Sequence, residues 1–458
     1  MEFKIDSMKG KKVLVVGLGK SGLSALRFLH QKGALVTVTD ARREEELKTR
    51  LDPTSLQLLT SNTIKKVFGS HPPKIFEEQD LIVLSPGVPT DLPGIKKALK
   101  KKIPVWGEME LACRAITIPI IAVTGTNGKS TTVTLIHEML KKGGKRVLLG
   151  GNIGTPLIDF VEPSRNNDLL VVEVSSFQLE TIQSFHPKVA VLLNIAPDHL
   201  DRYSRFTDYV KAKARLIKNQ DKNDLFIGNG SDKYCLAIAR KTKAKKCFFS
   251  SQKKIPGGLF LNGSEINYQF GKNKEVYLAR NNHLTGLHNK ENMMAAIATA
   301  RHFGVSVESI QGTLDSFLGL KHRMEYVRET NGVTYYNDSK GTNVSATLMA
   351  LAGLPDKKVL LIAGGRDKGS NYKPLKTVAR KKLKGLYLIG EAAEKIRREL
   401  GGQTKTVIAE TLEKAVYLVS GDAAWGDIIL FSPACASYDQ FKNFEHRGET
   451  FKNLVMRL

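Results

Sequence analysis

A short glycine-bearing segment, GTNGKST at residues 125–131, contains residue types that suit phosphate binding. It follows an apolar, β-branched run at 118–123 that predicts a buried strand, and a helix-like stretch follows it. A helix N-terminus offers unpaired N–H groups, Gly125 and Gly128 let the backbone curve around an anion, and Lys129 adds a positive charge. Val123 departs from the common P-loop pattern, which has glycine there. We nevertheless expect a phosphate-binding loop rather than an ordinary strand–turn–helix connection.

Polar residues also follow other apolar strands of the same block. Glu173 ends the run LLVVE, where a carboxylate is costly to bury unless a positive charge or hydrogen bonds meet it. Nucleotide-bound Mg²⁺ is the expected partner, and a hydrogen bond to a neighbouring backbone is the alternative. A histidine near a phosphate-binding loop can serve as a metal ligand or a general base, although a lone histidine more often does neither. The loop after the next strand contains Asn194, Asp198, His199, Asp201 and Arg202.

Downstream, residues 206–216 predict a helix with Lys211, Lys213 and Arg215, which by itself indicates a solvated basic face. Polar or small-residue loops then follow three strands near the C-terminus, at 337–343, 364–368 and 432–437. In an open parallel sheet, ligands bind beyond the carboxyl ends of the strands. We therefore expect these loops to form a second half-site that faces the phosphate-binding loop across a cleft and is brought in by domain closure.

The N-terminal block must position a further glycine turn. Gly17, Gly19 and Gly22 fit G-x-G-x-x-G between an expected strand at 13–16 and a helix, and Asp40 closes the second strand. This is the pattern of a mononucleotide-binding βαβ unit, and taken alone it suggests an NAD dehydrogenase. The pattern indicates a phosphorylated ligand and says little about which one.

Three α/β blocks follow one another along the 458 residues. We predict an N-terminal Rossmann-like domain at 1–107, a central P-loop-type domain with a mostly parallel sheet at 108–319, and a C-terminal Rossmann-like domain at 320–458. The order of elements at 229–285 does not follow from the pattern. Helix-like residues at 289–303 are expected to close the central block.

Net charge, cysteine count and the lengths of apolar runs narrow the classes of protein to which this chain can belong. The net charge of +25 at pH 7 invites a nucleic-acid interpretation, but the lysines are spread along the chain without a nucleic-acid-binding motif, so no specific nucleic-acid partner is expected. The four cysteines lack metal-ligand spacing and are expected to be buried thiols. Neither a signal peptide nor a membrane span is expected, so we predict a cytoplasmic protein without membrane insertion, and a monomer.

Eight segments spread along the chain carry a further pattern. They are GTNGKST (125–131), GNIG (151–154), VVEVSSFQLE (171–180), NIAPDHLDRY (194–203), GLHNKEN (286–292), GLKHRME (319–325), YNDSKGTN (336–343) and SPACASYDQFKNFEHRG (432–448). Together they resemble the Mur ligases of peptidoglycan synthesis over nearly the whole chain. The segments at 336–343 and 432–448 resemble the branch that adds D-glutamate, and folylpolyglutamate synthase shares the phosphate-binding loop but not these two C-terminal segments.

The resemblance implies that ATP phosphorylates the carboxylate of UDP-N-acetylmuramoyl-L-alanine and that the amine of D-glutamate displaces the phosphate. It also implies two Mg²⁺ ions and carbamoylation of Lys213 by CO₂. The expectation that Lys213 lies on a solvent-exposed basic face is replaced by this implied role. The implied catalytic residues are Lys129, Glu173, His199 and Lys213, and the implied metal ligands are Ser130, Glu173, His199 and carbamoylated Lys213. The implied ATP-binding residues are Gly125, Thr126, Asn127, Gly128, Lys129, Ser130, Thr131, Asn292, Arg323 and Asp338.

The same resemblance assigns the other two substrates. Ala41 and Lys20 depart from the family pattern, and Lys20 is expected either to engage the diphosphate or to point to solvent. Another ligase of the Mur or folylpolyglutamate type, a dehydrogenase and a nucleic-acid-binding ATPase remain the alternatives. The implied UDP-substrate residues are Leu18, Lys20, Ser21, Asp40, Arg42, Ser85 and Asn152, and those for D-glutamate are Thr342, Lys368, Ser437 and Phe444.

Overall fold

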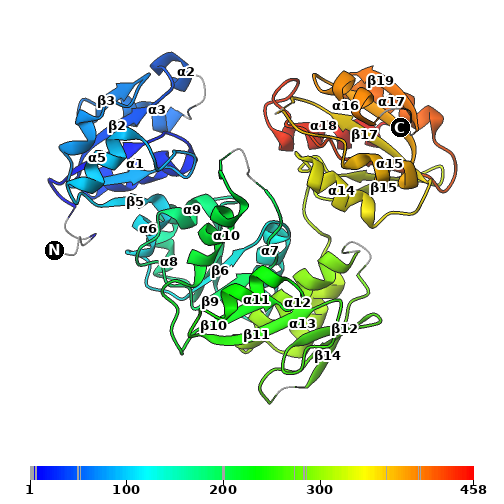
Figure 1. Cartoon of the computed structure of the whole chain (residues 1–458), viewed down its shortest axis with the longest axis horizontal. Helices are drawn as coiled ribbons and strands as arrows, with labels where there is room; N and C mark the ends of the chain where they lie inside the picture. The colour runs from blue at the N-terminus through cyan, green and yellow to red at the C-terminus, as the bar shows by residue number, and fades with distance from the viewer. Residues whose placement is uncertain are drawn as a thin grey trace. The chain divides into compact units, whose positions relative to one another are not determined.

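Three separate sheets organise the chain in a computed structural model (Figure 1). It describes residues 5, 8–48, 51, 53–198, 202–272, 274–281, 284, 286–367, 369–400, 402 and 404–458. The chain divides into a first compact unit, 1–280 with 288–315, and a second, 281–287 with 316–458, and each unit is described by itself. The predicted α/β class with mostly parallel sheets is confirmed. The predicted domain limits at 107/108 and 319/320 stay predictions.

The N-terminal sheet is five-stranded and parallel, in the order β3-β2-β1-β4-β5. Its strands are apolar and buried at the centre, as expected where helices cover both faces. The glycine turn joins β1 directly to α1, as the βαβ pattern predicted. The strands are β1 (Lys12–Val16), β2 (Leu35–Asp40), β3 (Lys65–Phe68), β4 (Leu81–Leu84) and β5 (Val105–Gly107), and the helices are α1 (Lys20–Gln31), α2 (Glu44–Lys48), α3 (Pro53–Thr60), α4 (Lys74–Glu77) and α5 (Pro93–Lys100).

The central sheet has nine strands in the order β14-β13-β12-β11-β10-β9-β6-β8-β7. Seven strands run parallel to one another, and β6, from which the phosphate-binding loop leaves, lies between β8 and β9. The parallel strands are β6 (Ile120–Thr124), β7 (Val147–Gly151), β8 (Leu169–Glu173), β9 (Val189–Leu192), β10 (Leu225–Asn229), β11 (Lys245–Ser250) and β12 (Leu259–Asn262). The helices are α6 (Glu108–Cys113), α7 (Lys129–Lys142), α8 (Val161–Ser164), α9 (Ser176–Glu180), α10 (Phe206–Ala214), α11 (Lys233–Ala239), α12 (Leu287–His302) and α13 (Val307–Ser316), with 3₁₀ turns η2 (Leu157–Phe160) and η3 (Arg215–Ile217).

An antiparallel edge lies at 259–278, within the segment 229–285 whose order the sequence pattern left open. Strands β12 (Leu259–Asn262), β13 (Glu265–Tyr268) and β14 (Glu275–Leu278) form an antiparallel meander, and β12 joins the sheet by pairing in parallel with β11. Gly263 and Ser264 form the two-residue turn between β12 and β13, and Gly263 has a positive φ of 60°. Gly-Ser between two short strand-like runs is a local hairpin signal, so the sequence did contain this information.

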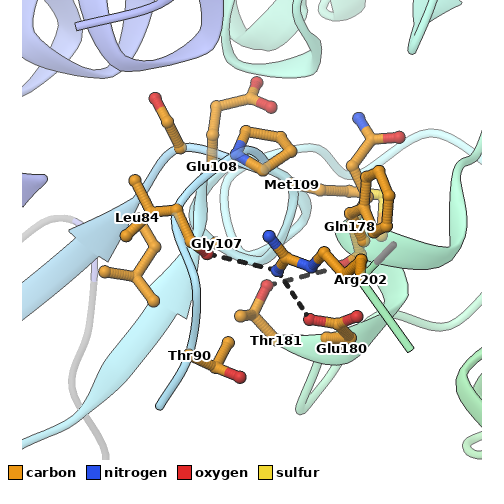
Figure 2. A pocket seen from close by; sticks show the side chains of 13 residues that line it. Leu84, Thr90, Gly107, Glu108, Met109, Gln178, Glu180, Thr181 and Arg202 are labelled. Atoms are coloured by element: carbon orange, nitrogen blue, oxygen red, sulfur yellow. Dashed lines mark hydrogen bonds and ion pairs between the residues drawn. The ribbon is translucent and has the colours of Figure 1, made fainter. Parts of the chain in front are cut away.

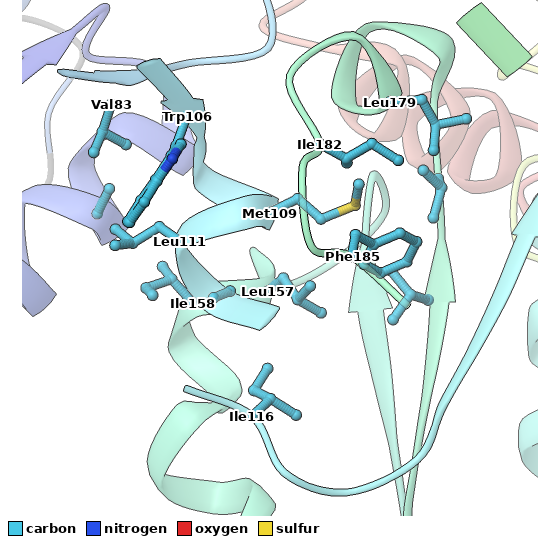
Figure 3. Close-up of a cluster of buried hydrophobic side chains, with 14 of the residues drawn as sticks. Val83, Trp106, Met109, Leu111, Ile116, Leu157, Ile158, Leu179, Ile182 and Phe185 are labelled. Carbon is cyan, nitrogen blue, oxygen red and sulfur yellow. The ribbon is translucent and has the colours of Figure 1, made fainter. Parts of the chain in front are cut away.

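The core of the first unit is continuous from the N-terminal sheet to the central one (Figure 3). Trp106 at the end of β5 and Met109 and Leu111 on α6 belong to the same buried cluster as Leu157 of η2 and Phe185 before β9. Apolar burial of this kind stabilises by about 25 cal/mol per Å². The N-terminal and central sheets therefore share one core within the first unit.

The second unit contains a six-stranded sheet in the order β15-β16-β20-β17-β18-β19. Only β15, which the sequence analysis did not predict, is antiparallel among these strands. Alternate residues of β17 enter two different buried clusters, Leu361 in one and Leu360 in the other, so both faces of the sheet are covered. The strands are β15 (Glu325–Thr330), β16 (Val333–Asn337), β17 (Val359–Gly364), β18 (Leu383–Ile389), β19 (Lys405–Glu410) and β20 (Ile428–Phe431), and the helices are α14 (Val344–Ala352), α15 (Leu375–Lys382), α16 (Ala393–Leu400), α17 (Leu412–Asp422) and α18 (Phe444–Met456).

Two further expectations concern the thiols and the membrane. Cys235, Cys247 and Cys435 are buried free thiols, whereas Cys113 is only half-buried, also as a free thiol. Within the part of the chain that the structure describes, no helix has both the length and the apolar character that crossing a bilayer requires.

Candidate active site

The phosphate-binding loop bends where the sequence places its second glycine. Gly128 has a φ of +85° and forms the N-cap of α7. A Cβ there would lie 2.3 Å from Oδ1 of Asn292, so both the left-handed backbone and the close approach require glycine. Because a glycine cap brings no side chain to the helix N-terminus, the first-turn N–H groups of α7 stay available to an anion.

Side chains from the neighbouring strand end hold this loop in shape. Asn194 accepts a hydrogen bond from the N–H of Asn127 at 2.9 Å and donates one to its carbonyl at 3.1 Å. The hydroxyl of Thr126 donates to the carbonyl of Ala196 at 3.1 Å and accepts from its N–H at 3.0 Å. The loop is therefore pre-organised by residues 194–196 as well as by its own glycines, which lowers the ordering cost of binding.

The ammonium of Lys129 lies against the same loop. Its Nζ donates to the carbonyls of Gly125 and Thr126, at 2.9 and 2.8 Å. A negatively charged phosphate is a stronger partner for an ammonium than a neutral carbonyl. The charge expected from the sequence is thus placed at the turn where a phosphate would bind.

Glu173 and Ser130 form a buried, hydrogen-bonded pair beside the loop. The Ser130 hydroxyl donates to Oε2 of Glu173 at 2.7 Å, and the side-chain amide of Asn152 donates to Oε1 at 2.8 Å. Mg²⁺ prefers carboxylate and hydroxyl oxygens, so this donor set fits the metal. Asn152, predicted to contact the UDP-substrate, touches Glu173 in this arrangement, and its substrate contact stays a prediction.

Lys213 contradicts the simple interpretation of its helix as a solvated basic face. Its side chain is 2% exposed, and Nζ donates to the carbonyl of Gly125 at 2.9 Å and to the hydroxyl of Thr124 at 3.3 Å. Burial, together with repulsion from Lys129, holds the pKa of Lys213 well below its usual range. Lys211, two residues earlier on α10, is exposed, so only one face of this helix is solvated.

Tyr209 belongs to the site although the sequence analysis gave it no role. Its hydroxyl lies 3.1 Å from that of Thr126, and its ring lies 4.8 Å from Nζ of Lys213. Residues four apart share one face of a helix, so the spacing from Lys213 was a usable signal.

The N-terminal glycine turn is built around Asp40. Its carboxylate accepts hydrogen bonds from the N–H of Leu18 at 2.7 Å and from the guanidinium of Arg42 at 2.9 and 2.7 Å. Burial by itself would raise the pKa of Asp40, but these hydrogen bonds outweigh it and lower the pKa to about 2. At Gly22 a Cβ would lie 1.9 Å from the carbonyl of Gly17, so this glycine permits close packing of α1 on the turn.

The other predicted UDP-substrate residues surround this turn. The hydroxyl of Ser85, at the end of β4, donates to the carbonyl of Gly17 at 2.8 Å. Leu18 is buried and Ser21 is half-buried. The ammonium of Lys20, an exposed residue, donates to the carbonyl of Gly154 in the central block, and its expected contact with the diphosphate stays a prediction.

A pocket opens where the loop after β4 meets α9 (Figure 2). Arg202 extends across it and donates to the carbonyl of Val88 at 3.2 Å and to Glu180 at 3.0 Å. Its guanidinium also lies 4.7 Å from the ring centroid of Phe177. Arg202 therefore ties the strand-end loop that follows Ser85 to the central block of the first unit.

Asp338, the one acid predicted for the second unit's site, is buried. Its Oδ2 accepts from the hydroxyl of Ser432 at 2.7 Å, and Oδ1 accepts from the N–H of Met324 at 3.2 Å. Burial raises its pKa to about 6, despite these hydrogen bonds. Its present partners are protein groups, so its predicted nucleotide contact, like that of half-buried Arg323, stays a prediction.

Three of the four residues predicted to hold D-glutamate are described residues of the same unit. Ser437 is buried, Thr342 is half-buried, and Phe444 begins α18 with its ring centroid 5.6 Å from Nζ of Lys340. The remaining member, Lys368, and the predicted metal ligand His199 lie outside the described residues.

Family models match all three blocks. The Mur ligase MurD-like N-terminal domain matches residues 11–107, the Mur ligase middle domain matches 123–300, and the Mur ligase glutamate ligase domain matches 322–435.

Solved structures support the fold at low sequence identity. MurF from Acinetobacter baumannii is similar with a TM-score of 0.61 at 16% identity, covering 99% of this chain and 92% of that one. A pseudomurein peptide ligase type C from Methanothermus fervidus gives 0.60 at 18% identity, covering 98% and 100%.

Curated relatives match at much higher identity along almost their whole length. The protein named UDP-N-acetylmuramoylalanine--D-glutamate ligase in Koribacter versatilis is 44% identical over 452 residues, with 98% of each chain covered. The protein of the same name in Geotalea daltonii is 45% identical over 451 residues, again with 98% of each covered. This chain therefore belongs to the Mur ligase family.

Proposed function

We propose that this protein is an ATP-dependent amide ligase that adds D-glutamate to UDP-N-acetylmuramoyl-L-alanine in peptidoglycan precursor synthesis. The phosphate-binding loop carries the proposal, since Gly128, Lys129 and the Ser130–Glu173 pair together present the donors and oxygens that a magnesium nucleotide requires. The shared name of the curated relatives supports the choice of substrates.

The proposed chemistry proceeds in two steps. The carboxylate of the L-alanyl group attacks the γ-phosphorus of ATP and releases ADP, which gives an acyl phosphate. The amine of D-glutamate then attacks the acyl carbon, and the tetrahedral intermediate loses inorganic phosphate and a proton to form the amide. Phosphorylation is needed because a free carboxylate lacks a good leaving group.

The residues of the first unit would hold the anions through both steps. The first-turn N–H groups of α7 and the ammonium of Lys129 would bind the terminal phosphates. Ser130 and Glu173 would hold Mg²⁺, and His199 would take part in a second site. When bound, the metal ions would offset the repulsion between nucleotide and acyl phosphate.

Carbamoylation of Lys213 is part of the proposal. Its amine is buried beside the loop and, among the described residues, no carboxylate forms an ion pair with it. A lysine without a counter-ion in such a place favours the neutral amine, the form that adds to CO₂ with loss of a proton. The product is a carbamate anion, which attracts a nearby cation where an ammonium would repel it.

The other substrates are assigned to the loops already described. Leu18, Ser21, Asp40, Arg42 and Ser85 would hold the UDP portion. Thr342, Lys368, Ser437 and Phe444 would hold D-glutamate, with Lys368 pairing one carboxylate. We further propose a cytoplasmic monomer without nucleic-acid or membrane partners, whose product serves cell-wall growth and division.

Phosphate release with Mg·ATP and UDP-N-acetylmuramoyl-L-alanine, measured across a panel of amino acids, tests this function. Release that depends on both the nucleotide sugar and D-glutamate is expected. Release with L-lysine in place of D-glutamate would reassign the amino acid, and release stimulated by DNA or RNA would favour a nucleic-acid-dependent ATPase. Reduction of NAD without phosphate release would favour a dehydrogenase.

A further inference from the structure

A fully buried guanidinium lies at the base of the second unit's strand-end loops. Arg447, on α18, is 0% exposed. Its Nε donates to the hydroxyl of Ser339 at 3.1 Å, and Nη2 donates to the carbonyls of Ser339 and Cys435 at 2.8 and 3.1 Å. Its Nη1 donates to the carbonyl of Ala436 at 3.0 Å. One side chain thus joins the loop after β16 to the loop after β20.

The partners of this guanidinium are unusual for a buried charge. Buried arginines are ordinarily paired with a carboxylate, because desolvation of a charge costs several kcal/mol. Among the described residues, no carboxylate is within ion-pair distance of Arg447, and neutral oxygens accept its hydrogen bonds. Hydrogen bonds from the planar guanidinium to several acceptors at once offset part of this desolvation cost.

A third loop closes around the same group. A Cβ on Gly365 would lie 3.1 Å from Nη1 of Arg447, and the N–H of Arg366 donates to the carbonyl of Ala436 at 3.0 Å. The loop after β17 is therefore packed directly against the two loops that the guanidinium joins.

Each described residue proposed for D-glutamate is adjacent to these contacts. Ser437 follows Ala436, and Thr342 lies three residues after Ser339 in the same loop. The hydroxyl of Ser339 also donates to the carbonyl of Phe444 at 2.8 Å. The contacts of Arg447 thus reach all three places from which the amino acid would be held.

We infer that Arg447 is a positioning residue for the incoming amino acid: its guanidinium fork sets the placement of the loops that carry Thr342, Ser437 and Phe444. The inference rests on the proposed function for the identity of the amino acid. It adds that the selectivity of this site depends on a buried residue that makes no contact with substrate.

If Arg447 positions the loops that bind the amino acid, its loss should change the KM for D-glutamate more than the KM for the other two substrates. The KM for D-glutamate should rise by about tenfold or more when the fork is lost, as is common when residues behind a binding site are changed. The KM for the nucleotide sugar should stay within about twofold, because the N-terminal turn is in the first unit and has supports of its own. The KM for ATP should rise less than that for D-glutamate, because the phosphate-binding loop is also in the first unit, although Asp338, which is proposed to contact the nucleotide, lies beside Ser339.

Three variants distinguish charge from geometry. Arg447→Lys keeps the charge and loses the fork, Arg447→Met loses both at similar volume, and Arg447→Ala leaves space for added guanidinium chloride. Arg457→Met is the matched control, since Arg457 is exposed just beyond the same helix. We expect Arg447→Lys and Arg447→Met to share the raised KM for D-glutamate, millimolar guanidinium to lower the KM of Arg447→Ala, and the control to match the unmodified protein.

Hydrogen–deuterium exchange gives a second readout that does not depend on activity. Peptides covering 336–343 and 432–438 should exchange faster in Arg447→Lys than in Arg457→Met, while peptides of β17 and β18 stay protected. If the protein without substitutions shows no D-glutamate-dependent phosphate release, the proposed function fails. Hydrogen–deuterium exchange in the two loops then tests by itself whether Arg447 fixes their placement. Unchanged exchange in those loops, equal rises in all three KM values, or loss of the folded state in every Arg447 variant would overturn the inference.

Discussion

Two glycine turns in the first unit follow the same local plan and differ in the charges around them. Each leaves a buried parallel strand, β1 or β6, and leads into a helix. At the N-terminal turn the N–H of Leu18 is bonded to the carboxylate of Asp40, and the ammonium of Lys20 contacts the carbonyl of Gly154. At the phosphate-binding loop the ammonium of Lys129 stays on the turn itself.

The difference shows that a glycine pattern specifies the shape of a turn, and that the surrounding charges specify its ligand. A carboxylate within hydrogen-bond distance of the N-terminal turn repels a phosphate placed there and favours groups that donate hydrogen bonds, such as a base or a sugar hydroxyl. A cation on the central turn favours a polyphosphate. Because G-x-G-x-x-G alone cannot express this difference, it suggested a dehydrogenase at first sight.

Removing the cation from the central turn should have the largest effect. Lys129→Ala should lower kcat by about 10³-fold, since it removes the cation that we propose to bind the transferring phosphoryl group. The rate of phosphate release with saturating substrates measures this fall in kcat. Binding of the nucleotide sugar, followed by calorimetry, should change by less than about twofold, and an equal loss of that binding would show that the two turns do not act separately.

Replacing the buried amine beside the same turn should be nearly as severe. Lys213→Ala should lower kcat by about 10²-fold, and added formate or acetate should restore part of the activity by taking the place of the proposed carbamate. Lys211→Ala is the control on the same helix, where the exposed side chain should contribute little. Full activity of Lys213→Ala, with no response to short carboxylates, would show that no carbamate is needed.

Much of the fold followed from the sequence because the parallel strands are apolar throughout. Runs such as those of β1, β6 and β8 are buried on both faces, and such runs are readily distinguished from loops. The edge strands were missed for the opposite reason. β13, β14 and β15 alternate or mix polar and apolar residues over a few positions, so their pairing is set by neighbours distant in sequence.

Site residues were predictable where the residues next to them in the sequence indicate their role. Gly128 and Lys129 follow a strand and open a helix, which is a local signal. The burial of Lys213 depends on α10 packing against the end of β6, a contact that spacing along α10 does not report. Arg447 was missed similarly, since its partners lie 11 to 108 residues away along the chain.

Neutralising the acid at the N-terminal turn should have an intermediate effect. Asp40→Asn loses an anionic acceptor of the Leu18 and Arg42 donors, so the KM for the nucleotide sugar should rise by about tenfold while the KM for ATP holds. The lowered pKa also predicts a stability effect. Because the folded pKa of about 2 lies below the ordinary value of 3.8, the carboxylate stabilises the fold above about pH 4 and loses that contribution as the pH falls through about 2.

Urea unfolding measures this second effect. At neutral pH the free energy of unfolding of the protein with Asp40 should exceed that of Asp40→Asn by about 1–2 kcal/mol, allowing for the partial exposure of Arg42. The difference should shrink steadily below pH 4. A difference that stays constant from pH 7 to pH 3 would mean that the Asp40–Arg42 pair contributes through packing rather than through its charge.

The contact between the N-terminal turn and the central block should contribute least. Lys20→Ala removes one exposed hydrogen bond to the carbonyl of Gly154, and exposed charged contacts seldom contribute more than about 1 kcal/mol. The KM for the nucleotide sugar should therefore rise by no more than about threefold, with kcat unchanged. Lys96→Ala, at an exposed position of α5, removes the same charge without that contact and should leave both constants unaltered. A tenfold or larger rise for Lys20→Ala alone would place its ammonium on the substrate's diphosphate, and the first turn would then resemble the second in binding phosphate through a lysine.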